Sequence, residues 1–153
     1  MFLYTRWLAE QRGLTFNGPP RHPFNPLPLL RLTIAAGSTL GAIKTVYSRV
    51  WGDGADAEAT STLEELAEAL GVSDAEQAIA TPAVKESLRA NTEEAISLGV
   101  FGVPTFAYGG ELFWGDDATP LFAAFLKDHQ IFKREPYVRF ERVKPSADRL
   151  RSK

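Results

Sequence analysis

The sequence contains no cysteine and only two histidines, His22 and His129. Without cysteine the chain cannot form a disulfide, a thiolate metal site or a C-x-x-C redox centre, so any thiol in its chemistry has to arrive on a ligand. Neither histidine has a second ligand residue at helical spacing, and Asp53 and Asp56 lack the spacing and closing glutamate of a calcium loop. We therefore expect no metal site.

Long apolar runs are also missing, and none approaches the roughly 18 residues of a membrane span. The N-terminal stretch has charges spaced through it and no continuous apolar core, so it does not read as a signal peptide. A cytoplasmic location without a membrane partner is expected. Net charge is −2, which carries no nucleic-acid signature. Residues 127–153 hold nine basic and four acidic side chains, and we expect a solvated basic tail there rather than a nucleic-acid surface.

At 153 residues and 44% hydrophobic content, the chain has the size and composition of one globular domain. Helical spacing of apolar residues predicts helices over residues 2–12, 27–36 and 39–51, separated by a proline-rich segment and a Gly-Ser break. Trp7 and Trp51 fall on the apolar stripes of these helices and are expected in the core.

Three further helix starts carry capping chemistry. Ser61 and Ser73 each open an S-x-x-E pattern, in which the hydroxyl and carboxylate satisfy free backbone N–H groups. Thr81 precedes Pro82 as a cap before a proline at the first helical position, and that helix should run to Gly99. A last helix is expected over residues 121–126.

The most informative stretch, residues 99–117, reads G-V-F-G-V-P-T-F-A-Y-G-G-E-L-F-W-G-D-D. It predicts two strands, 104–108 and 111–114, joined by the two-residue turn Gly109–Gly110 with primed geometry. The first strand has the apolar character of one with neighbours on both sides, yet the sequence offers no flanking strands. A lone two-stranded hairpin is marginal in water.

Two features of this stretch are candidates for ligand binding. A proline that opens a strand can be cis, and the bend then exposes the backbone groups of Val103 to an extended peptide; the alternative is an ordinary trans proline. Trp114 is a candidate wall for the same cleft. A carboxylate of the pair Asp116–Asp117 could bind the ammonium group of a peptide, or the pair could simply cap the last helix.

Four stretches occur in the order of one known family: residues 22–32, 46–51, 79–85 and 99–117. Together they resemble the 2-hydroxychromene-2-carboxylate isomerases and the kappa-class glutathione transferases, in the DsbA-like branch of the thioredoxin superfamily. The resemblance covers about residues 1–128. It implies an α/β, partial thioredoxin-like fold: a helical insertion over about 1–80, a helix–hairpin–helix unit over about 81–128, and a basic tail over 129–153.

The resemblance also implies ligands and roles. Glutathione would be the cofactor and a small aromatic molecule the substrate, with a homodimer as an open alternative. Val103 and Pro104 would hold the cysteinyl backbone of glutathione, Asp117 its glutamyl end, and Asn25 would lie near the substrate. Asn25 has the alternative role of capping a turn. Position 118 is alanine where the family usually has arginine, so one charged contact is absent.

The front of the sequence departs from the family, whose members open with a strand–helix–strand unit. That unit carries an S-P-Y-like motif whose serine favours the glutathione thiolate. The motif is absent here, so no catalytic residue is assigned. We expect a glutathione-dependent isomerase of aromatic degradation with weak or no activity as the 153-residue form. A kappa-type transferase, a non-catalytic helical binding or dimerisation module, and a reading frame begun at an internal methionine are the alternatives.

Overall fold

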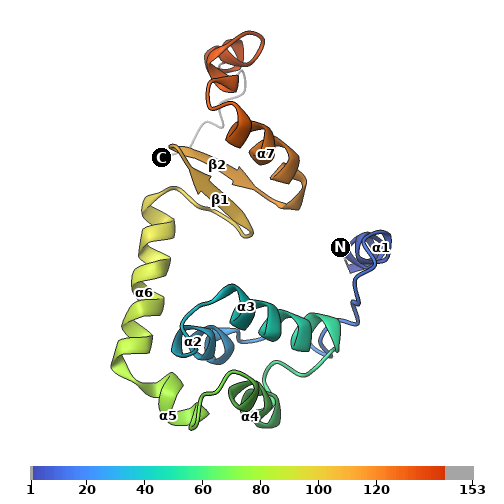
Figure 1. The fold of residues 1–153 in the computed structure, drawn as a ribbon, viewed down its shortest axis with the longest axis vertical. Helices are drawn as coiled ribbons and strands as arrows, with labels where there is room; N and C mark the ends of the chain where they lie inside the picture. Colours follow the sequence, from blue (N-terminus) through green and yellow to red (C-terminus); the bar gives the residue numbers. More distant parts are fainter. Residues whose placement is uncertain (1, 144–153) are drawn as a thin grey trace, which may run out of the picture. The chain divides into compact units, whose positions relative to one another are not determined.

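A computed structural model of the chain describes residues 2–143, which form two compact units dividing between Glu94 and Ala95 (Figure 1). The division falls within a long helix, α6 (Pro82–Ser97). The first unit is entirely helical, and the second contains the hairpin. The partial thioredoxin-like fold with high helical content that the sequence predicts is confirmed.

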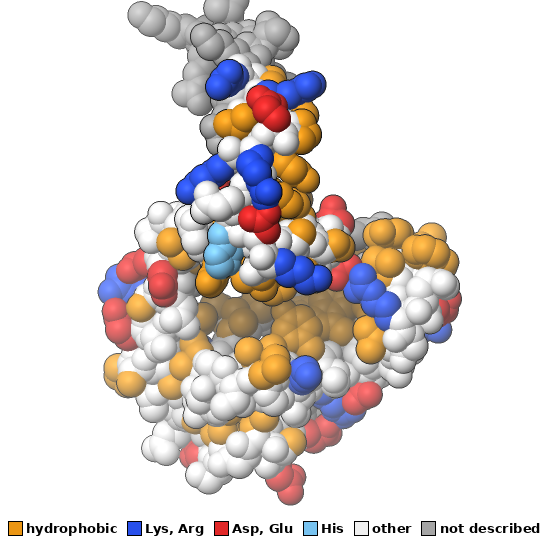
Figure 2. Space-filling model, turned by 45° about the horizontal axis from the view of Figure 1, so that its top comes forward, with side chains coloured by type: hydrophobic (Ala, Val, Ile, Leu, Met, Phe, Trp, Pro, Cys, Tyr) orange, Lys and Arg blue, Asp and Glu red, His pale blue; other side chains and the backbone are white. Residues whose placement is uncertain are grey.

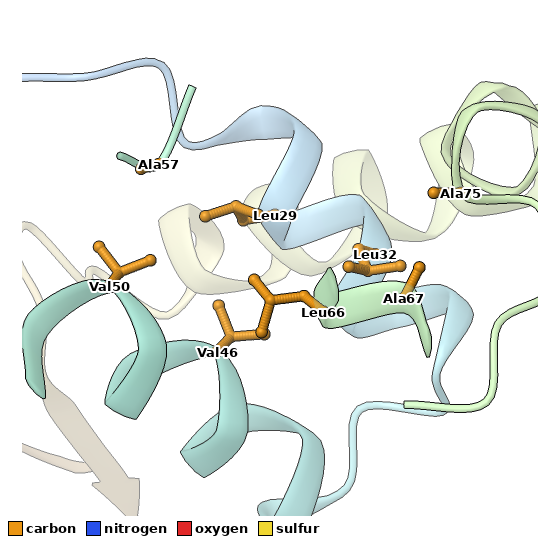
Figure 3. Packing of buried hydrophobic residues seen from close by; sticks show 8 residues of the cluster. All are labelled: Leu29, Leu32, Val46, Val50, Ala57, Leu66, Ala67 and Ala75. Atoms are coloured by element: carbon orange, nitrogen blue, oxygen red, sulfur yellow. The ribbon is translucent and has the colours of Figure 1, made fainter. Parts of the chain in front are cut away.

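The first unit combines α-helices with one π turn. Its elements before α6 are α1 (Phe2–Gln11), α2 (Leu27–Ala35), α3 (Leu40–Tyr47), the π turn η1 (Ser48–Gly52), α4 (Thr60–Ala69) and α5 (Ala75–Ala80). Their small core is drawn in Figure 3, where Leu29 and Leu32 of α2 face Val46 of α3 and Leu66 of α4. Leu32 has no exposed surface, so α2 is the central helix of this unit.

The start of α4 differs from the capping prediction. The helix begins at Thr60, its N-cap is Ala59, and no side chain caps it, so the prediction that Ser61 is the cap was wrong. Starting the helix early places Thr62 and Leu66 one turn apart on its buried face. Burial of that face therefore outweighs one capping hydrogen bond, which contributes about 1 kcal/mol.

The other two caps lie at or next to the predicted positions. At α5 the cap is Asp74, whose carboxylate accepts a 2.9 Å hydrogen bond from the backbone of Gln77, so the prediction of Ser73 was wrong by one residue. At α6 the hydroxyl of Thr81 accepts from the backbone N–H of Val84 at 3.4 Å, which confirms that prediction.

The helix predicted over 39–51 ends in the π turn. The backbone N–H of Asp53 donates to the carbonyl of Ser48 at 2.8 Å, an i to i+5 bond. The carbonyl of Trp51 accepts from the backbone N–H groups of Asn17 and Gly18, both at 3.0 Å. The proline-rich segment is therefore anchored to the end of this helix.

The two tryptophans expected in the core have different environments. Trp51 is half-buried and packs against the core, as predicted. Trp7 is 52% exposed and stacks on Tyr4 at 6.0 Å, so its assignment to the core was wrong. The reason is that α1 buries only Ala9, and Phe2 rather than Trp7 places its ring near Trp51, at 6.5 Å.

In the second unit, β1 (Thr105–Tyr108) and β2 (Glu111–Trp114) pair antiparallel with Phe106 opposite Phe113. Gly109 and Gly110 both have positive φ (62° and 86°), as the predicted primed turn requires. A short 3-10 turn, η2 (Asp116–Ala118), leads into α7 (Thr119–Lys127). Figure 1 shows α7 lying along the hairpin, and Phe122 stacks on Phe106 at 4.5 Å.

The first part of the tail is packed, which differs from the expected solvated extension. The 3-10 turns η3 (Ile131–Lys133) and η4 (Tyr137–Arg142) follow α7. Phe132 stacks on Phe125 at 5.3 Å and contacts Phe113 at 6.1 Å. An aromatic core thus compensates for the small size of the sheet. The expectation for residues 144–153 lies outside the described residues.

Candidate functional site

The loop between α6 and β1 is the local structure that positions Val103 and Pro104. Gly99, at φ 84°, ends α6 by donating its backbone N–H to Ile96 at 2.9 Å. The hydroxyl of Thr105 donates to the carbonyl of Gly102 at 2.6 Å and closes the loop from the other side. The Val103–Pro104 peptide bond is cis.

The register of the hairpin brings Trp114 to this loop. The backbone N–H of Gly115 donates to the carbonyl of Pro104 at 2.9 Å, and Thr105 lies opposite Trp114. The indole of Trp114 packs over Gly102 and contacts the ring of Phe101 at 5.0 Å. Val103, Pro104 and Trp114, which the sequence singles out separately, are therefore neighbours in one site.

Asp117 lies at the edge of the same site, in η2. Gly115, at φ 94°, turns the chain so that the Asp117 carboxylate folds back beside it, where a β-carbon on Gly115 would overlap an oxygen. The N-cap of α7 is Ala118, so Asp117 does not act as that cap. Within residues 2–143 its carboxylate has no hydrogen bond or ion pair, and it is exposed. It is available to a cationic group.

The backbone of Val103 is equally open. The side chain is 85% exposed, and neither its N–H nor its C=O is hydrogen bonded to a described residue. Because Pro104 and Phe106 face β2, the alternation of an antiparallel ladder turns the backbone groups of Thr105 and Ala107 to the other edge of β1. Within the described range that edge has no partner strand, whereas the sequence favours one.

Asn25 belongs to the first unit, whereas Val103, Pro104, Trp114 and Asp117 belong to the second. Its side-chain oxygen accepts a 3.1 Å hydrogen bond from the backbone of Leu27, and its own N–H donates to Glu58 at 3.1 Å. This is the turn-capping role that the sequence left open beside substrate binding. The substrate role stays a prediction.

Sequence reasoning missed three residues that shape the site: Phe101, Gly102 and Gly115. The signal for Gly102 is its place between a helix-ending glycine and a strand-opening proline, where close backbone approach favours the absence of a side chain. Among residues 2–143, no cluster of three or more acidic, histidine or cysteine side chains is arranged to hold a metal ion. No helix in the same range is both long and apolar enough to cross a membrane.

Comparisons with known proteins agree on one family. Residues 5–127 match the DSBA-like thioredoxin domain. Two relatives, each called 2-hydroxychromene-2-carboxylate isomerase, are 36% identical over 85 residues (Pseudomonas sp. strain C18) and 30% identical over 89 residues (Sphingobium xenophagum). The matches cover 54% and 56% of this chain but 40% and 45% of those proteins.

A solved structure of a 2-hydroxychromene-2-carboxylate isomerase matches with a TM-score of 0.66 and 26% identity. The match covers 80% of this chain and 62% of that chain. In its matches to the two relatives named above, the chain spans less than half of each relative's length. Because the family match extends over most of the sequence and the fold agrees with it, this chain belongs to the DSBA-like thioredoxin domain family.

Proposed function

We propose that the chain acts in a glutathione-dependent isomerase of the 2-hydroxychromene-2-carboxylate type, in the degradation of aromatic compounds. One observation carries the proposal. The backbone of Val103 and the carboxylate of Asp117, both without a partner among residues 2–143, lie in one site, joined through the Pro104–Gly115 hydrogen bond. Two relatives that match about half of this chain carry the isomerase name.

The chemistry of the site fits glutathione. The N–H and C=O of Val103 suit the backbone of a cysteinyl residue, as in strand addition. The Asp117 carboxylate suits the ammonium group of the glutamyl end, and the indole of Trp114 offers an apolar wall. When bound, glutathione would supply the thiol that this cysteine-free chain lacks. Exposed contacts of this kind contribute about 1 kcal/mol each, so we expect weak binding.

The described residues of the hairpin offer little to activate that thiol. The hydroxyl of Thr105 is committed to the carbonyl of Gly102 at 2.6 Å. Position 118 is alanine, so no cation stands beside Asp117 there. A thiol without a hydroxyl donor or nearby cation keeps a high pKa and is a poor nucleophile at neutral pH. We therefore expect the 153-residue form to bind glutathione but to convert substrate only slowly.

Calorimetric titration with glutathione tests the binding step. Asp117→Asn should weaken binding about three- to fivefold, the effect of losing one exposed ion pair. Glu111→Gln, the same change of charge at an exposed position of β2, should leave the affinity unchanged. Equal effects of the two variants would show that net charge, not the Asp117 contact, sets the affinity. No binding at millimolar glutathione would overturn the proposal.

The ultraviolet spectrum of 2-hydroxychromene-2-carboxylate tests the reaction. Slow conversion with glutathione and none with S-methylglutathione is expected, since only the former has a free thiol. Conversion at equal rates with both compounds would mean that the thiol takes no part, and the mechanism would be wrong.

A second candidate function, a non-catalytic dimerisation module, rests on the edge of β1 that has no partner strand within residues 2–143. The strand reads T-F-A-Y and has no charge, proline or bulge within it, and such edges pair readily with other strands. Sizing at several concentrations tests it. Self-association that Thr105→Lys abolishes would support this role, and a monomer at every concentration would exclude it.

A further inference from the structure

We infer that the first unit contains a separate binding site for a small, uncharged aromatic molecule, in a cavity between α2, α3, η1 and α6. The cavity has a volume of about 440 Å³. That falls within the roughly 300–1,000 Å³ typical of small-molecule sites. Every residue that lines it belongs to the first unit, so the site does not depend on the hairpin or on the proposed function.

The floor of the cavity is formed by packed core residues. Leu29, Val46 and Val50 line it and are 2–8% exposed, because they also form the helical core of this unit. Figure 3 shows the three side chains pointing toward one another from α2, α3 and the π turn. Side chains held in a packed core keep their rotamers, so the floor has a fixed shape.

The mouth of the cavity is apolar as well. Leu30 and Ile43 line it and are 44% and 37% exposed, and Tyr47 is 61% exposed. Large hydrophobic side chains reach the surface in several places on the molecule, as the orange atoms of Figure 2 show. At this mouth they surround a hollow rather than lie singly. An apolar ligand that covers these side chains would release water from them and from its own surface.

The residues that line the cavity favour an uncharged ligand. No lysine, arginine, histidine, aspartate or glutamate lies among the residues found around this cavity in the described chain. The hydroxyl of Thr33 is already committed to the carbonyl of Leu29 at 2.8 Å. A carboxylate placed here would lose its hydration without gaining a cation, which is costly. Asn91 and Ser38 offer hydrogen bonds to one uncharged polar atom.

The lining also favours an aromatic ligand. Phe24, Tyr47 and Trp51 all contribute to the wall. Aromatic rings gain from stacked or edge-to-face contact with other rings, beyond the area that they bury. A flat, uncharged two-ring molecule with one hydroxyl fits this wall and the volume.

The test uses two probes of similar size, 1-naphthalenemethanol and 1-naphthoate, and follows methyl resonances of the whole chain by NMR. The neutral probe should change the chemical shifts of the methyl groups of Leu30, Ile43 and Val46. It should also quench the fluorescence of Trp51. The carboxylate should bind at least tenfold more weakly. Equal binding of both probes, shifts located elsewhere, or no shift at saturation of the neutral probe would each overturn the inference.

Two substitutions on α3 provide the matched control. Ile43→Trp fills the mouth and should weaken the neutral probe at least tenfold. Leu40→Trp places the same side chain on the same helix at a site that is 67% exposed and outside the cavity, and binding should not change. Equal effects of the two would overturn the inference. Should Ile43→Trp fail to fold, Leu30→Trp fills the mouth from α2 and carries the same expectation.

Discussion

The indole nitrogen of Trp114 lies 2.5 Å from the position that a β-carbon on Gly102 would occupy. The two residues belong to different sides of the candidate site, the loop before Pro104 and the end of β2. A side chain at position 102 would therefore require the indole to move. Their contact links the shape of the loop to the position of the indole.

Gly102→Ala should therefore displace Trp114 and weaken glutathione binding several-fold, because the wall of the site moves away from Val103. Near-ultraviolet circular dichroism would report the indole, and calorimetry the affinity. Gly41→Ala, in α3, is the control, since a β-carbon there stands 3.8 Å from its nearest neighbour. That variant should keep the affinity and gain about 0.5–1 kcal/mol of stability. An unchanged indole signal in Gly102→Ala would contradict the expectation.

Two glycines with positive φ allow the energetic cost of backbone conformation to be separated from the cost of steric crowding. Gly54 has φ 82°, and a β-carbon there would lie 2.8 Å from the carbonyl oxygen of Gly18. Gly71 has φ 71° and open space. Gly71→Ala should cost about 1–2 kcal/mol of unfolding free energy, the conformational part alone. Gly54→Ala should cost clearly more, because the anchored proline-rich segment has to move. Denaturant unfolding measures both, and equal losses would refute the role of the close approach.

The aromatic core of the second unit should dominate its stability. Phe125 is 5% exposed and contacts Phe113, Phe132 and Tyr108. Phe125→Ala should cost about 3–5 kcal/mol of unfolding free energy. Phe140→Ala should cost little, because that ring is 61% exposed. Hydrogen exchange of the hairpin amides measures the loss within this unit. Comparable protection in the two variants would show that the core lies elsewhere.

The stability of the first unit should depend on acid pH through Asp56. The backbone N–H of Glu58 donates to its carboxylate at 3.1 Å, and the Arg21 guanidinium pairs with it; both hold the pKa of Asp56 below its ordinary value, the backbone bond more strongly. A carboxyl with a lowered folded-state pKa stabilises the fold above its unfolded pKa of about 4. That contribution disappears as pH falls through the folded-state pKa.

Carboxyl carbon NMR titration would give the Asp56 pKa directly. Arg21→Gln should raise it only in part, since the backbone hydrogen bond remains. Asp56→Asn should flatten the fall in unfolding free energy below about pH 4. A variant that kept the full acid dependence would place its origin in other carboxylates.

The sequence predicts elements well where local chemistry acts alone. Thr81 and Pro82 define the start of α6, and Gly109 and Gly110 define the hairpin, because a cap and a primed turn need only neighbouring residues. The hairpin register in turn brings Trp114 to Pro104. Prediction fails where tertiary packing decides. Ala59 rather than Ser61 is the N-cap of α4, and Trp7 is exposed because α1 buries only Ala9.

Other parts of the site depend on contacts that no local pattern reveals. The charged composition of the tail hides the packing of Phe132 on Phe125. The uncharged lining of the cavity comes from four segments spread over residues 24–91, none of which has a binding motif. The sequence shows an aspartate at position 117, but it does not show that this side chain leaves the helix uncapped. That follows only from the structure, where Ala118 is the N-cap of α7.

The π turn at the end of α3 holds one residue more than an α-helical turn would need. Removing Ser48 would let the helix close its ordinary hydrogen bonds, so the helix itself would survive. The i to i+5 bond takes the place of an i to i+4 bond, so the chain beyond Gly52 would keep its direction. The Trp51 carbonyl, which holds the backbone N–H groups of Asn17 and Gly18, lies inside the widened turn and would move when that turn closes. One surplus residue therefore decides where the proline-rich segment is anchored without changing the path of the chain that follows.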